Sequence, residues 1–181
     1  MKYFFDTEFL EDGKTIELIS IGIVAEDGRE YYAINEEAPW GRVVNDKWLR
    51  ENVAPSLPLI VTALGDGHRY DIQDGPAWRL KTDIRNEVVT FVGASPEFWA
   101  YYADYDWVCF CQLFGRMIDL PHGFPMYCRD IKQLCDSLGN PKLPEQLVGE
   151  HNALADAKWN AVAHEFLVDY QLPTPLTPGV D

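Results

Sequence analysis

Residues 2–8 have the sequence KYFFDTE, and this stretch decides the fold. Its aromatic and β-forming residues predict a strand over residues 2–5 that ends at Asp6. Residues 16–24 (IELISIGIV) predict a second, long strand with apolar residues on both faces, and residues 30–34 (EYYAI) predict a third. Short connections that contain Asp-Gly separate the three strands, so we expect an antiparallel meander at the start of the chain.

The rest of the chain is mostly helical. After the third strand, residues of about 35–80 form an irregular insertion. Within this insertion, the pattern of residues 55–76 is typical of a mobile flap. The other expected elements are a short helix over about 46–53, a helix with Thr82 as its N-cap, a strand over 97–102, a helix from about 106, a helix over about 129–138 and a terminal helix over about 152–170. We therefore expect one α/β domain over residues 1–181, with a Pro-rich tail over 171–181.

The charge balance limits the possible functions. The 181 residues include 29 acidic and 15 basic side chains, which gives a formal charge of -14. This balance argues against a protein that binds nucleic acid through bulk positive potential. Hydrophobic residues make up 47% of the chain, enough for a full core, so a disordered protein is excluded. The excess acid indicates either a solvated surface or carboxylates clustered around divalent cations, and the positions of the acids decide between the two.

Cysteine usage and the N-terminus favour a cytoplasmic protein. Cys109, Cys111, Cys128 and Cys135 form no CxxC pair and have no His at zinc-ligand spacing, so we expect reduced thiols in the core. The apolar stretch after Met1 is too short for a secretion signal, and no stretch is long enough for a membrane-spanning helix.

Asp6 and Glu8 form a D-x-E pair at the end of the first predicted strand. Residues two apart on a strand point to the same side, so both carboxylates can bind one ligand. The ends of strands are also where α/β proteins place their ligands. The alternative is a solvated strand end, since about one D-x-E pair is expected by chance in a chain of this composition.

His151 and Asp156 form an H-x-x-x-x-D pattern at the start of the terminal helix. The helix would hold Asp156 in its second turn, whereas His151 lies on the preceding loop and can swing over the same cleft. Taken alone, the pair is better explained by a loop histidine in water and an exposed helix aspartate.

Asp104 and Asp106 lie where the predicted strand over 97–102 meets the next helix. A carboxylate at a helix N-terminus is favoured by the helix dipole and by free N–H groups, so capping explains either residue. Both residues nevertheless offer an acid to a cleft at the strand ends.

The order of these motifs resembles that of the DEDDh exonucleases, which belong to the RNase H-like superfamily. Asp6 and Glu8, then Asp106, then His151 and Asp156 match the three family motifs along nearly the whole chain. The segments FFDTEF, SIGIV, WAYYADYDW and HNALADA are most similar to one branch, the small actinobacterial polyadenylate-specific 3'-exoribonucleases.

The second motif departs from the family pattern. Most relatives carry an Asn a few residues before the Asp, whereas this chain has two aspartates in the sequence YYADYD. The family Asp follows a bulky apolar residue and lies four positions before an aromatic residue. Asp106 meets both conditions, because it follows Tyr105 and lies four positions before Phe110. Asp106 is therefore the better match, with Asp104 in reserve.

The resemblance implies an RNase H-like mixed five-stranded sheet flanked by helices, and hydrolysis of a phosphodiester with two metal ions. The implied ligands of two Mg²⁺, with Mn²⁺ as a substitute, are Asp6, Glu8, Asp106 and Asp156. His151 would take the proton of the attacking water. The implied product is a nucleoside 5'-monophosphate released from the 3' end of single-stranded RNA, with a preference for poly(A), and the implied assembly is a homodimer.

Substrate contacts are expected beside the first motif. Thr7, Phe9 and Leu10 lie where relatives hold the terminal nucleotide through backbone groups and an apolar side chain. Phe9 can stack on a base, although a place in the core explains it equally well. We also expect the segment over 55–76 to become ordered when substrate binds.

A basic cluster and two alternative functions complete the expectations. Arg79, Lys81 and Arg85 can meet substrate phosphates, but a solvated helix start is the simpler explanation. A DNA-directed exonuclease of the same fold is the first alternative function. A non-catalytic domain that binds nucleic acid or cations is the second, and it is disfavoured because all five family positions carry the required residue types.

Overall fold

The first strand, β1 (Lys2–Glu11), lies inside the sheet that organises the fold. In the computed structural model, which describes residues 1–170, β1 continues through Asp6 rather than ending there as predicted. It pairs antiparallel with β2 (Ile16–Ala25), which in turn pairs antiparallel with β3 (Glu30–Asn35). The predicted meander is therefore confirmed, and pairing along the whole strand outweighs the low strand propensity of the acidic residues.

Six strands form one mixed sheet in the order β6-β3-β2-β1-β7-β8. β7 (Glu97–Ala100) pairs parallel with β1, β6 (Trp78–Arg79) with β3, and β8 (Arg129–Asp130) with β7. The predicted α/β fold, a mixed sheet flanked by helices, is thereby confirmed. The resemblance implied five strands, whereas the sheet has six. β6 and β8 have two residues each, too few to give a periodic signal in the sequence.

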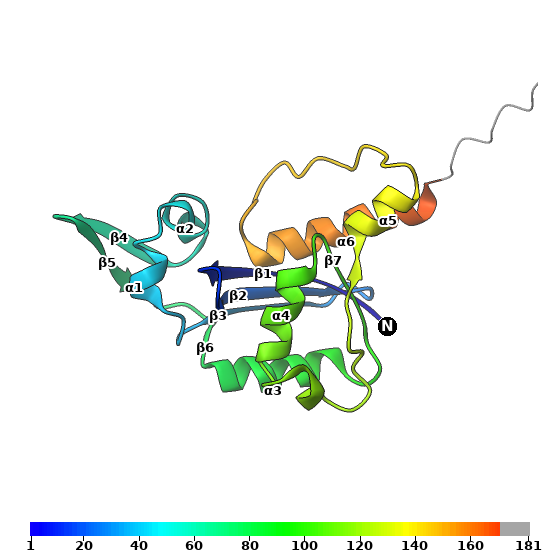
Figure 1. Cartoon of the computed structure of the whole chain (residues 1–181), viewed down its shortest axis with the longest axis horizontal. Coiled ribbons are helices and arrows are strands. Elements are labelled where there is room, and N and C mark those ends of the chain that lie inside the picture. Colours follow the sequence, from blue (N-terminus) through cyan, green and yellow to red (C-terminus); the bar gives the residue numbers. More distant parts are fainter. Residues whose placement is uncertain (171–181) are drawn as a thin grey trace, which may run out of the picture.

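Helices cover both faces of this sheet. They are α1 (Trp40–Val43), α2 (Lys47–Asn52), α3 (Lys81–Val92), α4 (Asp104–Gln112), α5 (Ile131–Ser137) and α6 (Ala153–Asp169), with 3-10 turns at η1 (Ala54–Ser56) and η2 (Met117–Asp119). Figure 1 shows α5 and α6 on one side of the sheet, and α3 and α4 on the other. Successive side chains of β1 point to opposite faces of the sheet and pack against both helical layers. Tyr3 and Phe5 pack with α3 and α4, whereas Phe4 packs with α5 and α6.

The segment over residues 55–76, predicted to be irregular, contains a β-hairpin. β4 (Leu59–Leu64) pairs antiparallel with β5 (Gly67–Ile72) around a two-residue connection. The first residue of that connection, Gly65, has a φ of +54°, which glycine adopts readily. The hairpin projects from the body of the molecule beside α1 (Figure 1). Its predicted ordering on substrate binding stays a prediction.

Two expected helix starts are confirmed and one is wrong. The side chains of Asp46 and Asn152 cap α2 and α6, each accepting a hydrogen bond from the backbone N–H three residues later. Thr82 does not cap α3, because that helix begins one residue earlier and has Leu80 at the cap position, with no side-chain hydrogen bond.

Gly22 allows the backbone of α6 to pack directly against the backbone of the sheet. A Cβ atom at this position would lie 2.3 Å from the carbonyl oxygen of Ala153, the first residue of α6. Gly22 is also the cross-strand partner of Asp6. The missing side chain therefore brings the start of α6 next to the acidic part of β1.

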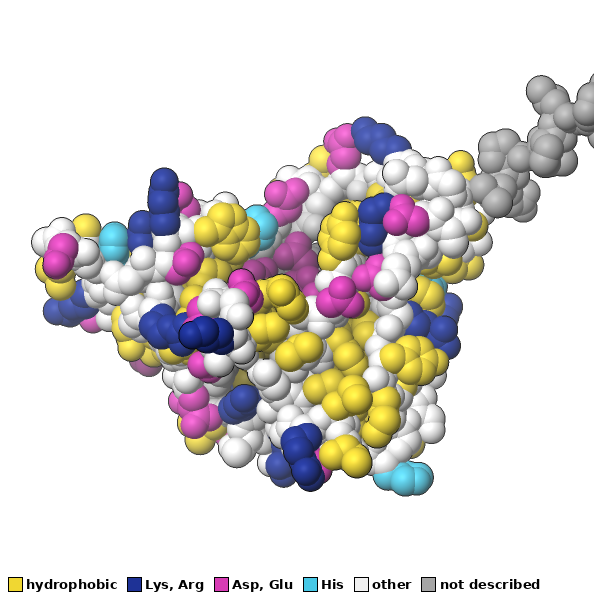
Figure 2. Space-filling model, viewed as in Figure 1, with side chains coloured by type: hydrophobic (Ala, Val, Ile, Leu, Met, Phe, Trp, Pro, Cys, Tyr) yellow, Lys and Arg dark blue, Asp and Glu magenta, His cyan; other side chains and the backbone are white. Residues whose placement is uncertain are grey.

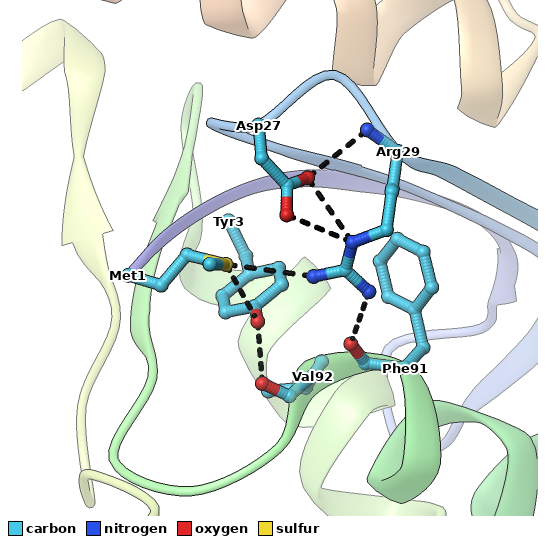
Figure 3. Close-up of polar contacts among 6 residues, drawn as sticks. All are labelled: Met1, Tyr3, Asp27, Arg29, Phe91 and Val92. Carbon is cyan, nitrogen blue, oxygen red and sulfur yellow. Dashed lines mark hydrogen bonds and ion pairs between the residues drawn. The ribbon is translucent and has the colours of Figure 1, made fainter.

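A polar cluster fixes the start of β1 (Figure 3). The Arg29 guanidinium donates hydrogen bonds to Asp27 and, over 2.9 Å, to the carbonyl oxygen of Phe91, whose ring centre lies 4.8 Å from the guanidinium carbon. The hydroxyl of Tyr3 donates to the carbonyl oxygen of Val92. Both carbonyls lie in the last turn of α3, so the cluster joins β1 to the end of that helix.

The remaining expectations concern cysteines, membrane spans and the tail. All four cysteines are free, three of them buried and Cys128 half-buried, as predicted. Within residues 1–170, no helix combines the length and the apolar character needed to cross a membrane. The expected Pro-rich tail over 171–181 lies outside the described residues.

Candidate active site

Three distant segments of the chain bring the predicted acidic residues together. One carboxylate oxygen each from Asp6, Glu8 and Asp156 lie within 4.8 Å of one another. Asp106 and His151 line the same cleft. Figure 2 shows this region as a hollow with acidic side chains at its floor and hydrophobic side chains around it. All five residues predicted from the motifs therefore share one site.

The structure distinguishes the two aspartates of the second motif. Asp106 is 6% exposed and its carboxylate lines the cleft. Asp104, the first residue of α4, is exposed to solvent and does not line the cleft. Of the two, Asp106 is placed to act with the D-x-E pair.

Thr7 holds Asp106 from the middle of the D-x-E motif. Its backbone N–H and its hydroxyl both donate to Oδ1 of Asp106, over 2.8 and 2.6 Å. Thr7 points to the face of the sheet opposite to that of its two acidic neighbours, because side chains alternate along a strand. The residue expected to contact substrate thus also orients an acidic side chain.

Burial, followed by the crowding of the carboxylates, raises the pKa values of these side chains. Burial first, and then the nearby carboxylates, raise the pKa of Asp6 well above its ordinary value. Burial is also the largest cause that raises the pKa of Glu8 to about 8 and that of Asp106 to about 6. Such mutual repulsion is relieved by a cation, and a set of carboxylate oxygens suits a hard divalent cation. The residues therefore fit the predicted metal site.

Gln146 is a contact of the site that the sequence did not reveal. Its side-chain Nε2 donates a hydrogen bond of 2.6 Å to Oδ1 of Asp156. The residue lies on the connection between α5 and α6, which has no periodic pattern and therefore gave no signal. Gln146 therefore helps to fix the orientation of the Asp156 carboxylate.

If the acidic cluster holds Mg²⁺ as the resemblance implies, Gln146→Ala should weaken activation by Mg²⁺, because Asp156 would lose a group that orients it. Partners that orient metal ligands typically contribute about 10–100-fold to metal affinity or activity. The measurement is the Mg²⁺ concentration that gives half-maximal RNA hydrolysis. Gln133→Ala, at an exposed position of α5, is the matched control. Equal Mg²⁺ dependence in the two variants would contradict the role of Gln146.

Aromatic side chains surround the acidic floor. Trp48, Tyr102 and Tyr105 line the cleft and are at least half exposed, at 53%, 64% and 50%. Phe9 also lines it and meets Tyr105 edge to face, with ring centres 5.8 Å apart. The tyrosines lie in the WAYYADYDW segment, where the density of aromatic residues could have indicated a substrate surface. Trp48 belongs to the insertion, where no sequence pattern indicated a place in the cleft.

Other residues predicted to contact substrate lie elsewhere. Leu10 does not line the cleft but is buried in a core cluster with Trp40 and Val43. In the basic cluster, Arg79 pairs with Glu87 at 2.9 Å, which supports the simpler explanation of a solvated helix start. The basic cluster likewise does not line the cleft.

The mixed sheet and the acidic cleft beside β1 agree with the RNase H-like nuclease class that the motifs predicted. Residues 65–168 match the model of a protein family described as the 3'-5' exoribonuclease Rv2179c-like domain. This match covers more than half of the chain, which therefore belongs to that family of 3'-5' exoribonucleases.

Two curated relatives come from Mycobacterium tuberculosis. They are the 3'-5' exoribonuclease Rv2179c of strain ATCC 25618 / H37Rv and the 3'-5' exoribonuclease MT2234.1 of strain CDC 1551 / Oshkosh. Each is 42% identical to this chain over 162 residues, which is 87% of this chain and 88% of the relative. The similarity thus extends over most of this chain.

Proposed function

We propose that this protein is a divalent-metal-dependent 3'-5' exoribonuclease that releases nucleoside 5'-monophosphates from the 3' ends of single-stranded RNA. The observation that carries the proposal is the convergence of Asp6, Glu8, Asp106, Asp156 and His151 on one cleft. Membership of the exoribonuclease family supports the same conclusion independently.

The four carboxylates are the proposed ligands of two Mg²⁺, with Mn²⁺ as a substitute. When bound, the metal activates water and stabilises the charge that develops on the leaving 3'-oxygen. Asp6 and Glu8 offer their oxygens from one side of β1, and Asp156, oriented by Gln146, offers one oxygen from α6. Asp106 completes the set from α4, oriented by Thr7.

His151 is the proposed general base. It lines the cleft beside the carboxylates but belongs to the loop before α6, so its ring can approach a water molecule without belonging to the metal-binding set. An imidazole accepts a proton near neutral pH, which suits removal of a proton from the attacking water.

Aromatic side chains are the proposed substrate contacts, together with backbone groups beside Thr7 and Phe9. Bases of any identity stack on aromatic rings, so an aromatic rim holds single-stranded RNA without a positive surface. This agrees with the formal charge of -14, which disfavours a long electrostatic contact with a duplex. The enzyme would hold a few nucleotides at a chain end.

We expect Trp48→Ala to raise KM for a short RNA about tenfold, because stacking on one aromatic ring contributes about 1–3 kcal/mol per base. Trp48→Phe should restore most of the affinity. Tyr127→Ala removes another exposed aromatic residue, outside the cleft, and serves as the control. A KM unchanged in Trp48→Ala would remove this residue from the substrate site.

The activity is tested with RNA labelled at either end. With Mg²⁺, RNA labelled at its 3' end should release labelled mononucleotide at once, whereas RNA labelled at its 5' end should shorten stepwise. Chelation of the metal and the variant His151→Ala should each suppress release. If the metal-replete protein released no mononucleotides, the proposed function would be wrong.

Substrate preference and assembly are further parts of the proposal, and both rest on the family resemblance. Matched single-stranded RNA and DNA distinguish the exoribonuclease from a DNA-directed exonuclease of the same fold. Poly(A) compared with poly(U) tests the adenine preference. Light scattering tests the proposed homodimer, and a monomer mass would remove it.

A further inference from the structure

His151 has an unusual backbone conformation. Its φ is +63°, in the left-handed region that non-glycine residues rarely adopt. Gly149, two residues earlier, has a φ of +81°, and a Cβ there would lie 2.7 Å from the Cβ of Ala155 in the first turn of α6. The chain therefore turns sharply to place His151 over the cleft. A residue in such a conformation needs surrounding contacts to keep it there.

Ser56 supplies one such contact from the inserted segment. Its hydroxyl oxygen lies 2.9 Å from the carbonyl oxygen of His151 and 2.9 Å from that of Val53. A hydroxyl has one proton to donate, and the Val53 carbonyl already accepts the backbone N–H of Ser56 over 3.0 Å. Among the described residues, the His151 carbonyl has this hydroxyl as its hydrogen-bond donor.

A second contact joins the same two parts of the molecule. The rings of Trp48 and His151 meet edge to face with centres 4.9 Å apart. Trp48 belongs to α2 and Ser56 to η1, so both contacts come from one short stretch of the insertion. Figure 1 shows α2 beside the start of α6. Ser56 itself does not line the cleft, so any effect it has on the reaction must pass through the His151 loop.

We propose that Ser56 is a positioning residue that holds the His151 loop in its left-handed conformation. The inserted segment would thereby orient the imidazole ring of the proposed general base. This inference rests on the proposed function only for the role of His151. The conformational part concerns two contacts of the chain itself and can be tested without any activity.

We expect Ser56→Ala to lower kcat about five- to tenfold while KM changes less than about twofold, since a lost hydrogen bond of this kind corresponds to about 1 kcal/mol. Ser56→Thr keeps the hydroxyl and should recover most of the lost activity. Ser137→Ala is the matched control. The Ser137 hydroxyl donates to the carbonyl three residues earlier, near the end of a helix, and lies outside the cleft.

A double-mutant comparison separates positioning from a general loss of structure. In a His151→Ala background the general base is absent, so adding Ser56→Ala should cause no further loss of kcat. An additional five- to tenfold loss in that background would show that Ser56 acts elsewhere, and would overturn the proposal.

Hydrogen exchange gives a readout independent of catalysis. In metal-free protein, Ser56→Ala should increase amide exchange about fivefold in peptides that cover residues 147–155, and Ser137→Ala should not. Unchanged exchange there, or unchanged kcat in an active enzyme, would overturn the role of Ser56. If the wild-type protein released no mononucleotides at all, the proposed function would fail, whereas the exchange result would still decide the conformational part.

Discussion

Asp6→Asn is expected to abolish RNA hydrolysis and, at the same time, to stabilise the metal-free protein. Asp6 stands among three other carboxylates, and burial together with their charges raises its pKa well above the ordinary value. An amide of the same shape removes that repulsion, so the free energy of unfolding should rise. It also removes a proposed metal ligand, so kcat should fall about a thousandfold or more.

The opposite signs of these two effects make the test specific. Urea unfolding in the presence of a chelator measures the stability, and the end-labelled RNA assay measures the activity. Asp74→Asn, at an exposed position outside the cleft, should change neither quantity. Loss of activity accompanied by loss of stability would mean that Asp6 supports the fold, and full activity in Asp6→Asn would refute its catalytic role.

The second large effect is a dependence of stability on pH that Mg²⁺ reverses. In the folded protein the pKa of Glu8 is raised from 4.5 to about 8 and that of Asp106 from 3.8 to about 6. A raised pKa means that the folded state holds its protons more tightly than the unfolded chain does. This contribution is fully present below about pH 4 and is lost as the pH rises toward 8, and for Glu8 it amounts to a few kcal/mol, about 5 at most.

Unfolding of the metal-free protein between pH 4.5 and pH 8.5 measures this slope. We expect stability to fall across the range in a chelator. With saturating Mg²⁺ it should hold level or rise, because ionised carboxylates bind the cation and binding stabilises the folded state. Glu8→Gln should flatten part of the slope without metal, because Asp6 and Asp106 also have raised pKa values. A metal-free stability that rises from pH 5 to pH 8 would contradict the crowding of carboxylates.

The sequence predicted the components of the site better than the extent of the elements that carry them. The D-x-E spacing placed Asp6 and Glu8 on one side of a strand, because strand geometry follows directly from residue spacing. That His151 and Asp156 belong to the same cleft was implied by the family resemblance and not by their spacing. The end of β1 was misplaced, because local propensity stops a strand at an aspartate whereas pairing with β2 continues to Glu11.

The inserted segment could not be predicted for a different reason. The strands β4 and β5 expose residues such as Ile60 and Leu64, so no burial pattern marked them, and only the Gly-Asp-Gly connection indicated a turn. The contacts of Trp48 and Ser56 with His151 join residues about a hundred positions apart. Such contacts depend on the tertiary arrangement, which spacing along the chain does not encode.

Gly22 limits how the active site can change in evolution or by engineering. The start of α6 contacts β2 backbone against backbone at Gly22. No side chain lies there that could be enlarged or shortened to change the distance between the α6 end of the site, with His151 and Asp156, and the D-x-E pair on β1. New substrate preferences would therefore arise from exchanges at the aromatic rim, while the separation between the start of α6 and β2 stays constant.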